Sequence, residues 1–80
     1  MTWLVIIRAV NGDEHVEHRY VSGQTPSPDE RDRLGLIIRD QFHETFDRNA
    51  HMVVNAILPY VPELDGQHAD WRDTLAEAAS

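Results

Sequence analysis

The sequence contains no cysteine, and all seven of its basic residues are arginine, so lysine is absent as well. Without cysteine there are no disulfides and no thiol chemistry, which fits a reducing compartment. Without lysine there is no amine nucleophile. Serine occurs only at positions 22, 27 and 80, and none of these lies in the strand-to-helix turn that a serine hydrolase needs. We therefore predict no enzymatic activity, no catalytic residue and no cofactor.

Long apolar runs are also missing. The apolar stretches fall far short of the roughly 20 residues that a membrane-spanning helix needs. The N-terminus has no basic segment followed by an apolar run and a small-residue cleavage site, which is the pattern of a signal peptide. We expect the 80 residues to form one domain, 1–80, near the size at which a single hydrophobic core is marginal. These absences predict a soluble cytoplasmic protein.

Positive charge is scarce relative to negative charge. Fourteen acidic residues face seven basic ones, a formal net charge of −7. Such a charge opposes binding to nucleic acid or to an anionic membrane, because the phosphate field repels it. It favours docking onto a basic surface of another protein. Solubility alone would also account for it.

Residues 27–49 have the pattern of one long amphipathic helix. Ser27 and Glu30 have the spacing of a reciprocal capping box, and Pro28 occupies the first helical position, where its missing N–H costs nothing. A mostly apolar stripe then follows at spacings of three and four. Its members are Leu34, Ile37, Ile38, Gln41, Phe42, Thr45 and Phe46.

Residues 3–10 and 15–21 predict two antiparallel strands that precede this helix. Asn11-Gly12 is a preferred pair for a two-residue hairpin turn. If Val10 pairs with Asp13 across that turn, one face of the hairpin is apolar and packs under the helix. That face pairs Trp3 with Tyr20, Val5 with His18 and Ile7 with Val16.

Residues 51–58 form an uncharged apolar run that fits two structures. A helix would align Val53, Ala56, Ile57 and Tyr60, whereas a strand would alternate Met52, Val54, Ala56 and Leu58 with their neighbours. We favour the helix. After Pro59 and Pro62, we expect a loop over 63–67 with Asp65 as a possible helix cap.

Residues 67–79 predict a last helix, with Trp71, Leu75, Ala78 and Ala79 facing inward. The fold class is therefore α+β, an N-terminal antiparallel β-hairpin packed on a long amphipathic helix and followed by a short and a C-terminal helix (ββααα). The alternative is ββαβα, with a third strand at 51–58.

Histidines give a weak metal pattern. His43, Asp47 and His51 are spaced by four and would line one side of a continuous helix, but Asn49 interrupts such a helix. We predict no metal site. His18 is expected to be half-buried with a hydrogen-bond partner, and His15 to be exposed.

Acidic residues recur on two helix faces. Asp40, Glu44 and Asp47 share one face of the long helix, and Asp70, Asp73 and Glu77 share one face of the last helix. Each set fits an ordinary solvated face. The functional hypothesis is that these carboxylates imitate phosphates and contact a basic partner. In size, charge and lack of catalytic motifs the chain is similar to small acidic bacteriophage proteins, including some anti-restriction and anti-CRISPR proteins.

The second face of the hairpin gives the other indication of a partner. Leu4, Ile6 and Val10 would be exposed there, rimmed by Arg8, Arg19 and Glu17, unless a later element covers them. Our first hypothesis is a non-enzymatic protein that binds another protein, for example as a DNA-mimicking inhibitor of a nucleic-acid-binding complex, without binding nucleic acid itself. The alternatives are an assembly module that dimerises through this face, and a small His/carboxylate metal protein or enzyme. The chain is expected to be a monomer or a homodimer.

Overall fold

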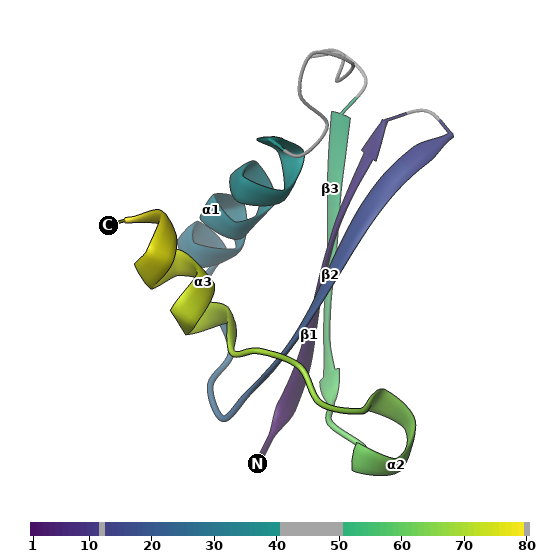
Figure 1. Ribbon diagram of the computed structural model, residues 1–80, viewed down its shortest axis with the longest axis vertical. Helices are drawn as coiled ribbons and strands as arrows, with labels where there is room; N and C mark the ends of the chain where they lie inside the picture. The colour runs from purple at the N-terminus through teal and green to yellow at the C-terminus, as the bar shows by residue number, and fades with distance from the viewer. Residues whose placement is uncertain (12, 41–50, 80) are drawn as a thin grey trace.

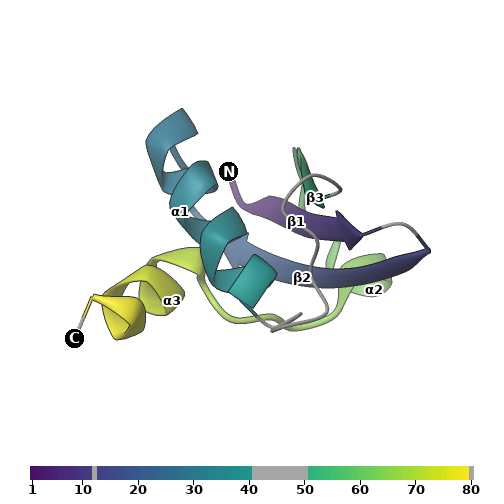
Figure 2. The ribbon, with the colours of Figure 1, turned by 90° about the horizontal axis from the view of Figure 1, so that it is seen from above.

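The computed structural model describes residues 1–11, 13–40 and 51–79. Its elements, in chain order, are β1 (Trp3–Asn11), β2 (Glu14–Ser22), α1 (Pro28–Arg39), β3 (His51–Pro59), α2 (Pro62–Asp65) and α3 (Trp71–Ala78). The strands form one antiparallel sheet in the order β2-β1-β3. The helices α1 and α3 lie together on one side of the sheet, and α2 lies on the other side, at the end of the sheet where β1 begins (Figures 1 and 2). The predicted α+β class is confirmed.

The hairpin pairs in a different register from the predicted one. Val5 pairs with Tyr20 and Ile7 with His18, so each β1 residue meets a β2 residue two positions later than expected. Asn11 belongs to the ladder, opposite Glu14, and the prediction that places it in the turn is wrong. Gly12 lies outside the described residues. Because side chains alternate with a period of two, a shift of two leaves the predicted faces unchanged.

Residues 51–59 form strand β3, so the favoured short helix at 51–58 is wrong and the alternative third strand is correct. β3 pairs with β1 along its whole length, from Trp3↔Pro59 to Asn11↔His51. The uncharged run fits either structure locally, and tertiary pairing decides between them. β1 is mostly apolar on both faces, with Arg8 as its one charged residue, and this suits a central strand. β3 pairs with the backbone groups along the second edge of β1.

The start of α1 confirms the predicted capping box. The Glu30 N–H donates to Ser27 Oγ at 3.2 Å, and the Ser27 N–H donates to Glu30 Oε1 at 2.9 Å. Pro28 occupies the first helical position, and α1 extends to Arg39 with Asp40 as its C-cap. The predicted continuation through Gln41, Phe42, Thr45 and Phe46 to Asn49 lies outside the described residues.

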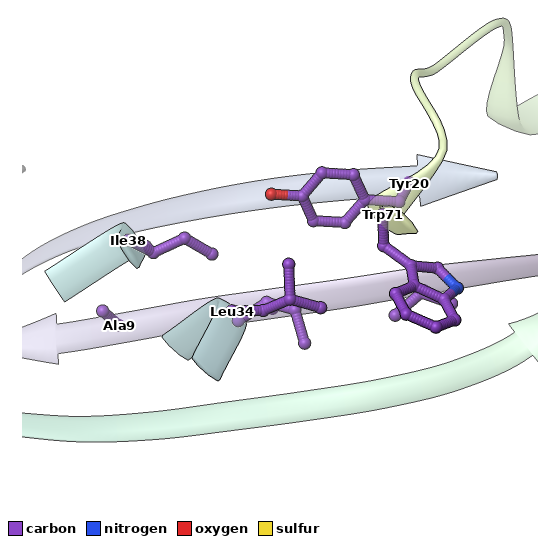
Figure 3. Packing of buried hydrophobic residues seen from close by; sticks show 7 residues of the cluster. Ala9, Tyr20, Leu34, Ile38 and Trp71 are labelled. Carbon is purple, nitrogen blue, oxygen red and sulfur yellow. The ribbon is translucent and has the colours of Figure 1, made fainter. Parts of the chain in front are cut away.

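The core is a single layer between the sheet and the two longer helices. Figure 3 shows Leu34 of α1 between Ile38 and Trp71, with Tyr20 of β2 beside them and Ala9 of β1 below. The buried cluster consists of Val5, Ile7, Ala9, Tyr20, Leu34, Ile38 and Trp71. The hairpin face predicted to lie under the helix is therefore the one that packs there.

The chain after β3 crosses to the opposite edge of the sheet before it enters α3. The Tyr60 N–H donates to the Thr2 carbonyl at 3.0 Å beside β3, and the Val21 N–H donates to the Ala69 carbonyl at 3.0 Å beside β2. Between these contacts lies α2, where a loop was expected. Asp65 is the last residue of α2, and its carboxylate accepts from the Val61 N–H at 2.8 Å. The N-cap of the last helix is Asp70, so Asp65 does not cap that helix.

The last helix is shorter than predicted. It begins at Trp71, which is 2% exposed, and the Trp71 indole N–H donates to the Gln24 carbonyl at 2.8 Å. Leu75 also packs against the core. Ala78 and Ala79 are exposed, so the expectation that they face inward is wrong. α3 meets the core at its beginning, and its last turn extends past the buried layer (Figure 1).

Candidate protein-binding surface

The face of the sheet turned away from α1 and α3 is called the open face. Leu58 is 47% exposed there, and the apolar residues Ile6, Val10, Val21 and Ala56 of the same face are partly exposed. The described members of the open face are Leu4, Ile6, Arg8, Val10, His15, Glu17, Arg19, Val21, Ala56 and Leu58. Apolar residues on an uncovered sheet face are the usual centre of a protein interface.

One end of the open face is covered. Leu4 is only 3% exposed, so for Leu4 the alternative holds in which a later element covers the second face of the hairpin. It lies at the end of the sheet where the connection through α2 crosses this face (Figures 1 and 2). On the open face, Ile6 and Leu58 are therefore accessible at least in part, whereas Leu4 beside them is covered.

Three charged residues form a connected cluster on the open face. Arg8 donates through Nε and Nη2 to Glu17 Oε1 at 3.2 and 2.8 Å, and Arg19 Nε donates to Glu17 Oε2 at 2.8 Å. Arg8 stands directly opposite Glu17 in the ladder, and Arg19 is two residues beyond on the same strand face. Hydrogen bonds from Arg19 and then from Arg8 lower the pKa of Glu17. Two arginines against one glutamate leave this patch with a local charge of +1 in a chain of −7.

The acidic set on α3 is split by its roles in the fold. Asp70 is the N-cap of α3, since its carboxylate accepts from the Arg72 N–H at 2.9 Å and pairs with the Arg72 guanidinium at 2.7 Å. The hydrogen bond from Arg72 lowers the pKa of Asp70. Asp73 and Glu77 are exposed. Two of the three carboxylates are thus directed at solvent, while the third stabilises the helix start.

The acidic set on α1 is described only in part. Asp40 is exposed at the C-cap of α1. Glu44 and Asp47 lie outside the described residues. The hypothesis that these carboxylates imitate phosphates stays a prediction.

Histidines of the hairpin follow the sequence expectation. His18 is half-buried, with its Nδ1 3.3 Å from the Tyr20 hydroxyl, and His15 is exposed. The other candidate ligands, His43 and Asp47, lie outside the described residues, as does the side chain of His51. Within the described part of the chain, no group of three or more His, Cys, Asp or Glu side chains could hold a metal ion.

Two shallow hollows lie along the junction of α1 and α3. The more apolar one has a volume of about 230 Å³ and is lined by Arg33, Leu36, Ile37, Leu75, Ala78 and Ala79. The other, about 270 Å³, shares Arg33, Leu75 and Ala79 with it. Ligand pockets in proteins span roughly 300–1,000 Å³ and enclose most of their ligand. These hollows are smaller and open to solvent.

The sequence analysis missed two members of the open face, Ala56 and Leu58. The favoured helix does not line them up with Ile6, whereas the alternative strand puts both on one face. In β3, Ala56 pairs with Ile6 and Leu58 with Leu4. The alternation of residues 52 to 58 was the signal that could have placed them.

Comparison with protein-family models, with curated proteins and with solved structures gives no match to this chain. Among the described residues, no helix is both long and apolar enough to cross a bilayer. The function is therefore argued from the surfaces of the fold alone.

Proposed function

We propose that this protein is a non-enzymatic binding module that holds a partner protein on the open face of its sheet. The observation that supports this most directly is the uncovered position of Leu58, 47% exposed beside the partly exposed Ile6 and Ala56. Full burial of a leucine side chain stabilises by about 1.5–3 kcal/mol relative to full exposure. Covering Leu58 would recover roughly half of that amount.

The charged cluster beside these apolar residues sets the orientation of the partner. Arg8 and Arg19 keep 46% and 43% of their side chains exposed, while the Glu17 between them is 22% exposed. Guanidinium groups that are already held by a carboxylate lose less rotamer freedom when a partner adds a further hydrogen bond. The contact patch of the partner should therefore combine apolar residues with hydrogen-bond acceptors.

The net charge acts at longer range. A chain of −7 is attracted towards a protein with a net basic surface, and this raises the rate of encounter. Within our proposal, a nucleic-acid-binding effector is the partner class that this charge favours, and the protein would act as its inhibitor. The class of partner is inferred from the net charge alone, whereas the binding surface is inferred from the positions and exposure of its residues.

The test compares two leucines of equal exposure on opposite sides of the molecule. Leu58 on the open face is 47% exposed and Leu36 on α1 is 48% exposed. Tagged wild type, Leu58→Asp and Leu36→Asp would be used to capture partners from the native host, with quantitative mass spectrometry. We expect a protein bound by wild type and by Leu36→Asp to be lost with Leu58→Asp.

Circular dichroism and thermal denaturation of both variants would show that each remains folded. A partner lost with Leu36→Asp and retained by Leu58→Asp would move the binding surface to the junction of α1 and α3. The open-face proposal fails in that case, and also if wild type captures nothing above an untagged control.

A further inference from the structure

The outer edge of β3 exposes backbone groups that can be identified from the register. Thr2 and Tyr60 continue the β1–β3 ladder, and the Tyr60 N–H donates to the Thr2 carbonyl at 3.0 Å. Along a strand, successive N–H and C=O groups point to opposite edges. Ala56 and Leu58 therefore direct their backbone groups to β1, whereas Asn55 and Ile57 direct theirs outwards. No described residue donates to or accepts from the outward groups of Asn55 and Ile57.

The other edge of the sheet, on β2, is protected. By the same alternation, Glu17, Arg19 and Val21 point their backbone groups outwards, since their neighbours in the strand face β1. The Val21 N–H is bound by the Ala69 carbonyl at 3.0 Å. Glu17 and Arg19 place charged side chains along the rest of this edge. Charge and a covering segment are two of the devices by which proteins block unwanted strand pairing.

Within the part of the chain that the structure describes, strand β3 shows neither of these devices over most of its length. Its nine residues, HMVVNAILP, include no acidic residue, lysine or arginine, and proline occurs only at its last position, Pro59. Asn55 is exposed and Ile57 is partly exposed. A long, uncharged and unprotected edge strand either aggregates or is covered in the functional state.

We propose that β3 pairs antiparallel with β3 of a second copy across a two-fold axis, so that two three-stranded sheets join into one. A second copy fits because β3 itself contributes no acidic residue, lysine or arginine, so two chains of −7 do not bring acidic residues of this strand together. The charged side chain that the structure places against Asn55 is the base Arg31. Antiparallel pairing of a strand with itself is isologous, which is the commonest symmetry of protein dimers.

Asn55, at the middle of β3, supplies a self-complementary group for the axis. Its Oδ1 is 3.4 Å from Arg31 Nη1, and no described residue accepts from its amide NH₂. An amide is both donor and acceptor, so two Asn55 side chains on the same sheet face can exchange hydrogen bonds. Since Asn55 points its backbone groups outwards, an Asn55–Asn55 pair is also a hydrogen-bonded pair of the ladder, with Cα atoms about 5.5 Å apart.

The absence of native cysteine allows a direct test by disulfide crosslinking. The expected Cα separation lies within the roughly 4.4–6.8 Å that a disulfide spans. Purified Asn55→Cys should oxidise rapidly to a covalent dimer, read on a non-reducing gel. His15→Cys is the matched control, because His15 is also exposed and has outward backbone groups, but on the β2 edge. The proposal is overturned if both variants crosslink equally slowly, or if His15→Cys crosslinks faster.

A second measurement removes any effect of the introduced thiol. Light scattering coupled to size exclusion, over a dilution series, should give a dimer mass for wild type and for His15→Lys, and a monomer mass for Asn55→Lys with an unchanged circular dichroism spectrum. Wild type that stays monomeric at every concentration contradicts the proposal, as does an Asn55→Lys variant that stays dimeric. Leu58→Asp leaves the outward backbone groups in place and should remain a dimer, so this dimer and the proposed function can fail independently.

Discussion

Replacing Trp71 by alanine should destabilise this protein more than almost any other single substitution. Trp71 is 2% exposed, packs beside Leu34 and carries α3 into the core (Figure 3). Truncation of a buried tryptophan to alanine costs about 3–5 kcal/mol. At about 0.05–0.15 kcal/mol per residue, an 80-residue domain has a total stability of roughly 4–12 kcal/mol. The substitution would therefore remove about a quarter or more of the free energy of unfolding.

A second substitution distinguishes the contribution of the Trp71 ring to stability from that of its hydrogen bond. Trp71→Phe keeps an aromatic ring in the core but removes the indole N–H that donates to the Gln24 carbonyl at 2.8 Å. A neutral hydrogen bond contributes about 0.5–1.5 kcal/mol to stability, and the smaller ring adds a packing loss. Because Gln24 is exposed, its carbonyl can bind water instead. We expect a total cost of about 1–3 kcal/mol.

Urea denaturation followed by far-ultraviolet circular dichroism measures both costs. The sequence has two tryptophans, so Trp3 remains as a fluorescent probe of the sheet in either variant. Leu64→Ala is the matched control, because Leu64 is 83% exposed on α2 and should change stability by no more than about 0.5 kcal/mol. If Trp71→Ala costs no more than Leu64→Ala, α3 does not dock through Trp71 and the core described above is wrong.

Two further predictions concern the helix starts. Ser27→Ala should cost about 0.5–2 kcal/mol through loss of the α1 cap, and an unchanged urea midpoint would show that the capping box does not contribute to stability. Asp70 has a pKa lowered by Arg72 from 3.8, so its stabilisation is present above that pH and is lost as the pH falls through the folded-state value. Asn is also a good N-cap, so Asp70→Asn should keep α3. Because this variant has no carboxylate at position 70 to protonate, its melting temperature should fall less than that of wild type below pH 3.8. Melting temperatures that fall equally with pH in both proteins would contradict this.

Local chemistry made part of this fold predictable from the sequence. The capping box depends only on Ser27, Pro28 and Glu30, which are close in the chain, and the structure contains both of its hydrogen bonds. The buried face of the hairpin was also predicted correctly, because alternation of side chains survives a register shift of two. In both cases the deciding interactions lie within a few residues or repeat with a fixed period.

Tertiary contacts decided what the sequence could not. Residues 51–58 fit both the helical period and the strand period. Only hydrogen bonding to the second edge of β1 decides that they form a strand. Tertiary contacts also explain why Asn11 is not in the turn. In the observed register, all nine residues of β1 pair with all nine residues of β2, and Asn11 lies opposite Glu14. Whether Leu4 is exposed or covered stayed open in the sequence, because the sequence does not show where the segment through α2 crosses the sheet.

The central position of β1 determines where the apolar surface and the free strand edge of this sheet lie. In a two-stranded hairpin, β1 itself would be an edge, and the second face would consist of β1 and β2 alone. With β3 added, the free edge moves from β1, which carries Arg8, to a strand without acidic residues, lysine or arginine. The same addition brings Ala56 and Leu58 next to Ile6 and Leu4 on the open face. The apolar surface and the unprotected edge thus both arise from β3. They remain separate surfaces, because Leu58 directs its side chain to the open face, whereas Asn55 directs its backbone to the edge.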